Sequence, residues 1–210
     1  MVDVIAFSGS PIKNGNIEKG LQAVLAATGL ETELVRLVEL DMRFCVGCKR
    51  CADLNRCVFD DDVNPILDKI EKARGLIFSA YPSFSSVNAL TKCFIERNWP
   101  LRHNRVLTQG KVGAAVICGR TGLDELAEYF ETYFVRYLLA DFQGTLKLEG
   151  NVPCLSCGFG ESCPGSGFLS QHGPGAKITP DKFRDFGRNP VAQSQAAELG
   201  RAVGRAVRGG

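Results

Sequence analysis

The sequence has no excess of charge of either sign and no long hydrophobic run. It contains 25 lysine and arginine residues and 23 aspartate and glutamate residues, a formal net charge of +2. This balance gives no electrostatic reason to expect nucleic acid as a partner, because phosphate binding requires many clustered cations. The longest apolar stretches, at residues 75–80 and 112–118, are far too short to span a bilayer. We therefore expect a soluble protein with no membrane segment.

A secretory signal is also lacking. The apolar run at residues 2–7 has no basic region before it and leads directly into a predicted strand. We therefore expect the nine cysteines to be reduced thiols in a cytoplasm, rather than the disulfide framework of a secreted chain. A chain of 210 residues can bury a sizeable core, and we expect one domain over residues 1–210.

Short apolar runs and amphipathic periodicities alternate along the chain, which predicts strands and helices in turn. The expected strands are 2–7, 32–38, 75–80, 112–118 and 142–148, and the expected helices are 16–28, 63–70, 87–97, 123–139 and 190–207. This alternation predicts an α/β fold with a five-stranded parallel sheet and helices on both faces. Asn16 and residues 60–62 are expected to cap the first two helices, the aspartates as a cap rather than a metal site.

Four cysteines lie within thirteen residues, in a loop at 44–60 that follows the second predicted strand. Their spacing is C-x2-C-x2-C-x5-C, formed by Cys45, Cys48, Cys51 and Cys57. Two-residue gaps let successive thiolates converge on one centre, and four thiolates complete the ligand set of a [4Fe–4S] cluster. Zinc is the alternative metal, but structural zinc usually takes its ligands as two separated pairs. The spacing therefore favours a cluster over zinc and indicates redox chemistry.

A second cysteine group lies at residues 150–189, in a Cys-, Gly- and Pro-rich excursion that precedes the last helix. It consists of Cys154, Cys157 and Cys163. These repeat the last part of the first spacing, but Asn151 takes the place of a fourth cysteine. One interpretation is a second cluster or metal site. Its fourth ligand would be His172, Cys118, Cys93 or a residue of another subunit. The other interpretation is an ordered lid in which reduced cysteines and glycines pack beside the main site.

The turn between the first strand and the first helix is rich in small and hydroxyl-bearing residues. Backbone N–H groups at a helix N-terminus, together with hydroxyls, form a phosphate pocket. The turn matches neither the Walker loop nor G-x-G-x-x-G, so a monophosphate fits better than a nucleoside triphosphate or a dinucleotide. A plain turn whose polar residues only cap the helix is the alternative. The candidate binding residues are Ser8, Ser10, Pro11, Ile12, Lys13, Asn14, Gly15, Asn16 and Ile17.

The loops after the third and fourth strands are expected at the same edge of the sheet, because ligands bind at the carboxyl ends of parallel strands. One loop offers an aromatic tip among polar groups, and the other offers glycine backbone that can approach a flat ring. Three such loops at one edge suit a flavin. Ordinary burial is the alternative for either aromatic alone. The candidates are Tyr81, Pro82, Ser83, Phe84, Ser85, Ser86, Gly119, Arg120, Thr121 and Gly122.

Taken together, these motifs resemble the iron-sulfur flavoprotein family, a branch of the flavodoxin-like FMN reductases. The resemblance covers most of residues 1–149. It rests on Gly9-Ser10-Pro11 with Gly15-Asn16, on the first cysteine group, and on residues 87–97, which end in Phe94-Ile95-Glu96-Arg97 where the family has F-I-D-R. Two positions depart from the family pattern, since Ile17 replaces a threonine and Ala80-Tyr81-Pro82-Ser83 replaces T-P-V-Y.

The resemblance implies a flavodoxin-like doubly wound sheet and two cofactors. FMN would have its phosphate at Ser8, Ser10 and Asn16 and its isoalloxazine ring against residues 81–86 and 119–122. The resemblance also implies a homodimer or homotetramer. In it, a [4Fe–4S] cluster on the first cysteine group would lie near a flavin, either that of the same subunit or that of the partner subunit.

The expected function is electron transfer, because a cluster passes one electron whereas a flavin holds one or two. We expect a ferredoxin-type donor and a small-molecule acceptor such as oxygen, peroxide or a quinone. The alternatives are an NAD(P)H-dependent FMN or quinone reductase whose cysteines bind zinc or form a lid, and a non-catalytic redox sensor. A basic stretch containing Lys92, Arg97, Arg102 and Arg105 is expected to be solvated rather than to bind an acidic ferredoxin.

Overall fold

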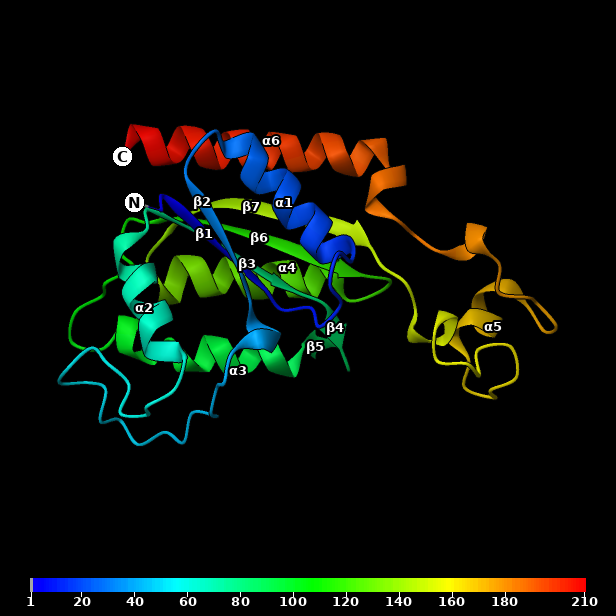
Figure 1. The fold of residues 1–210 in the computed structure, drawn as a ribbon, viewed down its shortest axis with the longest axis horizontal. Helices are drawn as coiled ribbons and strands as arrows, with labels where there is room; N and C mark the ends of the chain where they lie inside the picture. The colour runs from blue at the N-terminus through cyan, green and yellow to red at the C-terminus, as the bar shows by residue number, and fades with distance from the viewer. Residues whose placement is uncertain (1) are drawn as a thin grey trace.

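The computed structural model describes residues 2–210 and has an α/β architecture (Figure 1). A central parallel sheet has the strand order β2-β1-β3-β6-β7. Its strands are β1 (Val4–Ser8), β2 (Thr32–Arg36), β3 (Gly75–Ala80), β6 (Val112–Gly119) and β7 (Asp141–Glu149). Counted along the chain, this is the order 2-1-3-4-5 of flavodoxin-like folds. The expected fold is therefore confirmed.

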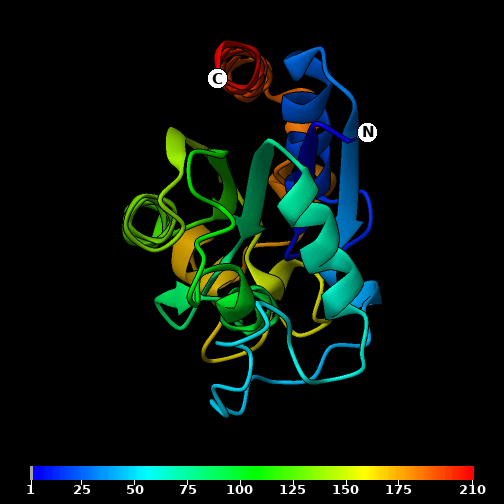
Figure 2. The same ribbon diagram turned by 90° about the vertical axis from the view of Figure 1, so that its left-hand side faces the viewer.

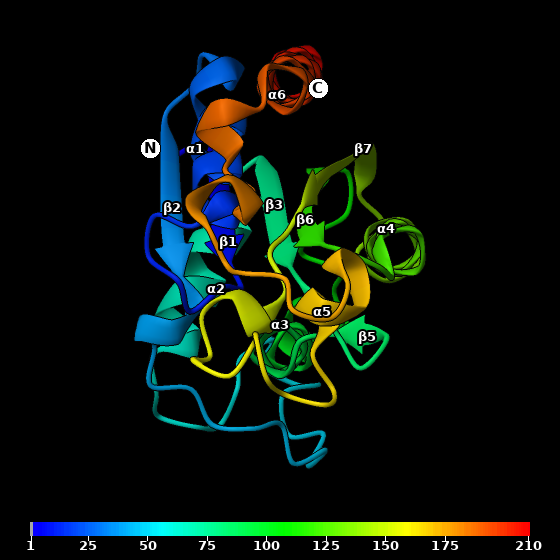
Figure 3. The same ribbon diagram turned by 90° about the vertical axis from the view of Figure 1, so that its right-hand side faces the viewer.

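Helices cover both faces of this sheet (Figure 3). One face is covered by α1 (Asn16–Thr28) and α6 (Pro190–Gly209), and the other by α2 (Val63–Lys72), α3 (Ala89–Arg97) and α4 (Leu123–Thr132). Successive strand residues point to opposite faces. Val4 and Ala6 accordingly join the core under α1 and α6, whereas Ile5 and Phe7 join the core under the other three helices.

Three local expectations are wrong. The helix expected over 123–139 ends at Thr132 and continues as a π-helix, η3 (Tyr133–Tyr137), whose first two residues are both buried aromatics. The loop after β3 contains a short hairpin of β4 (Pro82–Ser83) and β5 (Ser86–Val87). Asn16 does not cap α1, because it is already helical and Gly15 holds the N-cap position without a side-chain bond.

Two long segments extend from the sheet layers. The loop between η1 (Leu37–Glu39) and α2 contains the first cysteine group and lies below α2 in Figure 2. The excursion at 150–189 projects past the carboxyl edge of the sheet (Figures 1 and 3). Its short helices are η4 (Pro153–Leu155), α5 (Gly167–His172), η5 (Pro180–Lys182) and η6 (Phe186–Arg188). Within residues 2–210, no helix is both long and apolar enough to cross a membrane.

Candidate functional site

Ser8 ends β1 and points a buried hydroxyl at the carboxyl edge of the sheet. The residue is fully buried, and its Oγ has no hydrogen-bond partner among residues 2–210. Buried polar groups in proteins are normally paired, because an unmade hydrogen bond there is costly. The hydroxyl therefore marks a position where a bound molecule would supply the missing partner.

Gly9 follows in the tightest part of this loop. A Cβ at this position would lie 1.9 Å from Thr91 Oγ1 and 2.5 Å from the Ser79 carbonyl oxygen. The Gly9 N–H donates to Ser79 Oγ at 3.0 Å, and the Gly9 carbonyl accepts from Asn88 Nδ2 at 3.0 Å. Only a residue without a side chain allows this approach, so the loop after β1 is held directly against the end of β3 and the start of α3.

The polar residues Ser79, Asn88 and Thr91 were not among the sequence candidates. Asn88 is 1 % exposed and also accepts from the Tyr81 N–H at 3.2 Å, so it joins the loops after β1 and β3. The sequence signal that could have identified Asn88 is its position directly before α3, at the carboxyl edge of the sheet. The contact it makes with Gly9 spans 79 residues of sequence, which periodicity cannot detect.

The remaining predicted phosphate-loop residues fall into three groups. Ser10 is buried, and its Oγ accepts from the Ile12 N–H at 3.2 Å. Ile17 is part of the core under α6. The exposed loop residues, whose backbone surrounds the N-terminus of α1, are Pro11, Ile12, Lys13 and Asn14, with Gly15 after them. This arrangement leaves Lys13 as a cation at the rim of the loop.

Glu18 places a carboxylate beside the same loop. It is 2 % exposed, accepts from the Asn14 N–H at 2.7 Å, and forms an ion pair with Arg36 at 2.5 Å. The hydrogen bond with Glu18 raises the pKa of Arg36. The pairing compensates a negative charge that would otherwise oppose a phosphate at this helix N-terminus.

Asn16 lies at the loop but is bonded to the excursion. Its Nδ2 donates to the Arg184 carbonyl at 3.0 Å, and its Oδ1 accepts from the Phe186 N–H at 2.9 Å. A polar cavity of about 290 Å³ lies between Asn16, the end of β7 and the residues before α6. The excursion is thereby fastened to the loop that the sequence assigns to phosphate.

The two ring loops meet the first loop at the same edge. A Cβ on Gly119 would lie 2.7 Å from Pro82 Cδ, and one on Gly122 would lie 3.4 Å from Pro82 Cβ, so the loops after β3 and β6 are in contact. Phe84 and Ser85 form the tip of the β4–β5 hairpin with φ of 48° and 58°. Such values are unusual for a bulky residue, and the Phe84 side chain is fully exposed.

The other predicted ring-loop residues lie around this contact. Tyr81 is partly buried against the core under α1 and α6. Ser83 and Ser86 form the β4–β5 pair, and Arg120 and Thr121 lie between Gly119 and the start of α4. The structure thus brings all three predicted loops together. The unpaired Ser8 hydroxyl fits a bound FMN at this edge.

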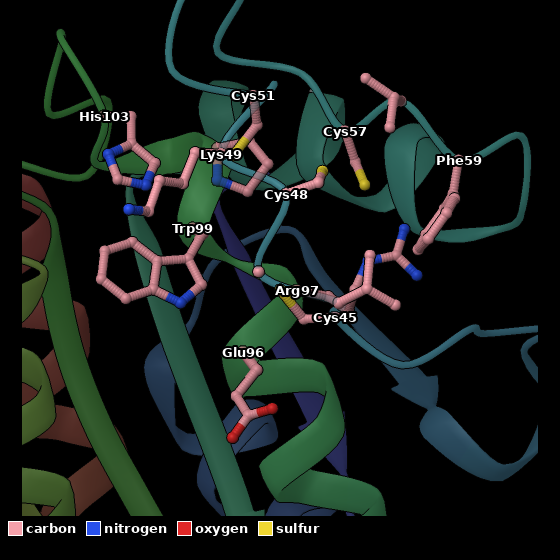
Figure 4. Close-up of a pocket in the computed structure, with 14 residues that line it drawn as sticks. Cys45, Cys48, Lys49, Cys51, Cys57, Phe59, Glu96, Arg97, Trp99 and His103 are labelled. Carbon is pink, nitrogen blue, oxygen red and sulfur yellow. The ribbon is translucent and has the colours of Figure 1, made fainter.

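The first cysteine group lines a separate cavity of about 220 Å³ (Figure 4). Cys45, Cys48, Cys51 and Cys57 all contribute to its wall, and the far side is formed by the end of α3 with Trp99 and His103. Burial raises the pKa of Cys51 despite a backbone hydrogen bond that lowers it, and the three neighbouring cysteines add smaller increases. The four cysteines therefore line one cavity.

Arg97 is a charged residue in the wall of this cavity. It was expected to be solvated, but it is 1 % exposed and pairs with buried Asp61 at 2.6 and 3.0 Å. Burial lowers the pKa of Arg97, but the Asp61 hydrogen bonds and the nearby Cys57 thiolate raise it overall. The guanidinium lies beside Cys57, and its charge is already paired with the Asp61 carboxylate. A sequence cannot reveal this because Asp61 and Arg97 are far apart along the chain.

The donor set fits an iron-sulfur cluster better than a hard cation, because thiolates are soft ligands. Within residues 2–210, no three histidine, cysteine or carboxylate side chains have the arrangement of a formed metal site. Metal binding would draw the loop sulfurs together, as is common when binding is coupled to folding.

Helix α3 connects the two places. Its N-cap residue Asn88 donates to the Gly9 carbonyl and Thr91 in its first turn packs against Gly9, whereas its last residue, Arg97, lies at the cysteine cavity. Nine helical residues rise about 13 Å at 1.5 Å per residue. The cysteine cavity and the edge that fits FMN are therefore separated by about one short helix.

The second cysteine group lies in the excursion. Cys154 and Cys163 are partly exposed and Cys157 is exposed. Backbone N–H groups of Phe168 and then Gly167 lower the pKa of Cys154 despite some burial. No candidate fourth ligand joins these thiols in a formed site among residues 2–210.

The three candidate fourth ligands lie in different surroundings. Burial raises the pKa of Cys118 to about 12, so it is a protonated core thiol. Cys93 lies beside the first group, where its Sγ contacts the Arg43 carbonyl at 3.8 Å. His172 packs its ring 4.8 Å from that of Phe168.

Comparisons with known proteins identify the family of the chain. The model of the NADPH-dependent FMN reductase family matches residues 2–141, more than half of the chain. The chain is similar to an iron-sulfur flavoprotein of Methanocaldococcus jannaschii, with 38 % identity over 120 residues that cover 55 % of this chain and 61 % of that protein. It is also similar to an iron-sulfur flavoprotein of Methanosarcina thermophila, with 34 % identity over 55 % of this chain and 62 % of that protein.

The matches thus span only about three-fifths of the length of these two relatives. A solved archaeal flavodoxin has the same fold, with a TM-score of 0.54, 12 % identity and 99 % coverage of both chains. At that identity the likeness concerns the fold alone. The family match and the flavodoxin-like sheet confirm the expected resemblance, and the chain belongs to the NADPH-dependent FMN reductase family of flavin-dependent oxidoreductases.

Proposed function

We propose that this protein is an electron-transfer iron-sulfur flavoprotein. FMN binds at the loops after β1, β3 and β6, and a [4Fe–4S] cluster binds at the first cysteine group. When bound, the cluster exchanges single electrons and FMN holds one or two, so that the pair links one-electron donors to two-electron acceptors. The relatives named as iron-sulfur flavoproteins support both cofactors.

The observation that carries this proposal is the position of α3 between the two sites. Its N-cap residue, Asn88, donates to the Gly9 carbonyl of the phosphate-side loop, and its last residue is in the wall of the cysteine cavity. One rigid element therefore fixes the distance between the cofactor positions. In a homodimer or homotetramer, the cysteine loop of one subunit would also approach a flavin of its partner.

The residues of this chain have defined parts in the scheme. Ser8 and the N-terminus of α1 bind the phosphate, and Lys13 at the rim adds positive charge. Arg97 donates to the Arg43 carbonyl at 2.6 Å and pairs with Asp61, which holds the cysteine loop at the end of α3. The donor is a ferredoxin-type protein and the acceptor is a small molecule that reaches the ring loops. The reduced thiols that this scheme requires fit a cytoplasmic protein.

Anaerobic reduction of the flavin tests this scheme. A reduced bacterial-type ferredoxin is mixed with the purified protein and the flavin absorbance is followed. We expect rapid bleaching in the wild type, at least a tenfold slower rate in Cys48→Ser, and an unchanged rate in the control Ser194→Ala, an exposed residue of α6. Equal ferredoxin rates in all three proteins would contradict the proposal.

The family description supports one alternative, a reductase that takes hydride from NADPH. In that case NADPH would bleach the flavin quickly in every variant, because the cysteines would have a structural part only. Slow reduction by NADPH together with a cysteine-dependent ferredoxin rate separates the two functions.

A further inference from the structure

A cavity of about 370 Å³ lies between α3 and the π-helix η3, next to the four-cysteine cavity. Its volume falls within the range of roughly 300 to 1,000 Å³ that small-ligand pockets occupy. Four aromatic rings contribute to its wall, those of Trp99, Tyr129, Tyr133 and Tyr137. Aromatic walls of this kind favour a flat, largely apolar molecule.

Asn98 adds an unpaired polar group to that wall. The residue is 2 % exposed, and its Nδ2 donates to the Tyr133 hydroxyl at 2.9 Å while its Oδ1 has no partner among residues 2–210. If the amide were flipped, Oδ1 would accept from the Tyr133 hydroxyl and the NH2 group would have no partner. One end of the amide therefore remains unpaired in either orientation. A buried amide with a free end is costly unless a ligand completes it.

Arg102 supplies a charge without a counter-charge. Its guanidinium lies 5.4 Å from the Trp99 ring centre and 5.0 Å from the Tyr137 ring centre. In the described part of the chain no carboxylate pairs with it. Lys92 in the same wall is compensated by Glu96 at 3.6 Å. The cavity therefore has one uncompensated positive charge at its rim.

The π-helix places two of the aromatic residues. Tyr133 and Tyr137 are the first and last residues of η3, and both line the cavity. Single-turn π-helices are rare and occur frequently at functional sites. The local departure from α-helix thus coincides with the cavity wall.

We propose that this cavity binds a planar aromatic molecule with a carboxylate or similar anion at one end and an O–H or N–H donor at the other. The anion pairs with Arg102, the ring lies among the tyrosines and Trp99, and the donor completes Asn98 Oδ1. Glu96 and Trp99 also line the four-cysteine cavity, so the ligand lies one side chain away from it. Binding itself does not depend on either cofactor.

Three probes test the assignment by isothermal titration calorimetry on the full chain purified with its cofactors. The first, 6-hydroxy-2-naphthoate, has ring, anion and donor, whereas 2-naphthoate lacks the hydroxyl and 2-naphthol lacks the carboxylate. We expect the complete probe to bind one per chain, 2-naphthoate to bind about fivefold more weakly, and 2-naphthol about tenfold more weakly. No binding of the complete probe would overturn the proposal.

Variants of Arg102 locate the anion. Arg102→Gln should weaken 6-hydroxy-2-naphthoate about tenfold and leave 2-naphthol almost unchanged, because only the first probe has the charge that Arg102 pairs with. Arg102→Lys should recover part of that loss, and Arg205→Gln on the exposed face of α6 is the matched control. Equal losses for both probes would overturn the assignment of the anion to Arg102.

A second copy of the chain is the competing occupant of this surface. Sedimentation velocity with and without the complete probe separates the two cases. An assembly mass that does not change when the probe binds supports a ligand cavity. An oligomer that does not bind the probe, and that Arg102→Gln dissociates, would overturn the proposal.

Discussion

At the residue scale, the hydroxyl of Ser8 gives the sharpest test of the FMN position. It is buried without a partner, so Ser8→Ala removes no hydrogen bond within residues 2–210 and should leave the stability of the FMN-free protein unchanged. The same change should weaken FMN binding by about tenfold, because hydrogen bonds to charged groups contribute about 1.5 kcal/mol or more. FMN titration followed by flavin fluorescence measures the effect.

Ser79→Ala is the matched control for this change. Ser79 Oγ donates to the Phe7 carbonyl at 2.9 Å and accepts from the Gly9 N–H at 3.0 Å, and the residue is fully buried. Its loss should lower the free energy of unfolding by about 1 to 3 kcal/mol. Unchanged FMN affinity in Ser8→Ala would place the phosphate elsewhere.

The buried pair of Asp61 and Arg97 gives a second residue-scale prediction. Both side chains are almost completely buried, and removal of one partner leaves the other charge unpaired. Asp61→Asn should therefore cost about 3 kcal/mol of unfolding free energy. Asp68→Asn, which breaks the exposed pair with Arg56, is the control and should cost less than about 1 kcal/mol. Urea denaturation measures both.

The same pair predicts an acid-sensitive stability. Burial raises the pKa of Asp61, but hydrogen bonds from Arg97 and the Arg43 N–H lower it overall. A lowered folded-state pKa contributes stability above the unfolded value of about 3.9, and that stability is lost as the pH falls through the folded value. The wild type should lose more stability than Asp61→Asn below about pH 4. An equal loss of unfolding free energy in the two proteins below about pH 4 would contradict this prediction.

At the scale of elements, α6 depends on two small residues where it crosses α1. A Cβ at Gly200 would lie 2.3 Å from the Val24 carbonyl oxygen, and one at Gly204 would lie 2.3 Å from the Thr28 carbonyl oxygen. Because these contacts are with backbone, Gly200→Ala must move the helix, and we expect a loss of at least about 1 kcal/mol despite the better helix propensity of alanine. Thermal unfolding measures the change.

Gly209→Ala on the same helix meets nothing within 4 Å and is the control. It should be neutral or slightly stabilising. An equal loss of stability in Gly200→Ala and Gly209→Ala would show that the contact with α1 is not the cause of the destabilisation.

The strands and main helices were predictable because each rests on a local pattern. Val4 to Phe7 is a continuous apolar run and residues 75–80 are mainly apolar, and the carboxyl ends of such strands meet at one edge in any parallel sheet. The β4–β5 hairpin was not predictable, since Phe84 and Ser85 at positive φ do not match the glycine and asparagine usual in such turns. The π-helix at 133–137 has no sequence signal.

At the scale of the whole molecule, long-range contacts were the least predictable. The first cysteine group was found from spacing, but the burial of Arg97 against Asp61 and the bonds of Asn16 to the excursion join segments that are distant in sequence. Neither follows from composition or periodicity. The edge that combines three loops followed from topology, whereas the residues that fasten it, Asn88 and Thr91, required the structure.

The whole molecule also separates the two cysteine groups. The first lies at the end of α3 under the sheet layers, and the second projects past the carboxyl edge with the excursion (Figure 1). They cannot share one metal site within a chain in this arrangement. The second group therefore needs its own ligand set if it binds a metal at all.

An iron-sulfur cluster and FMN on one chain can be counted directly. The most direct measurement is the content of iron, sulfide, zinc and FMN per chain in protein purified without oxygen. We predict about four irons with matching sulfide and one FMN, and loss of the iron but not of FMN in Cys48→Ser. Zinc in place of iron, or FMN with no metal in folded wild-type protein, would contradict the account.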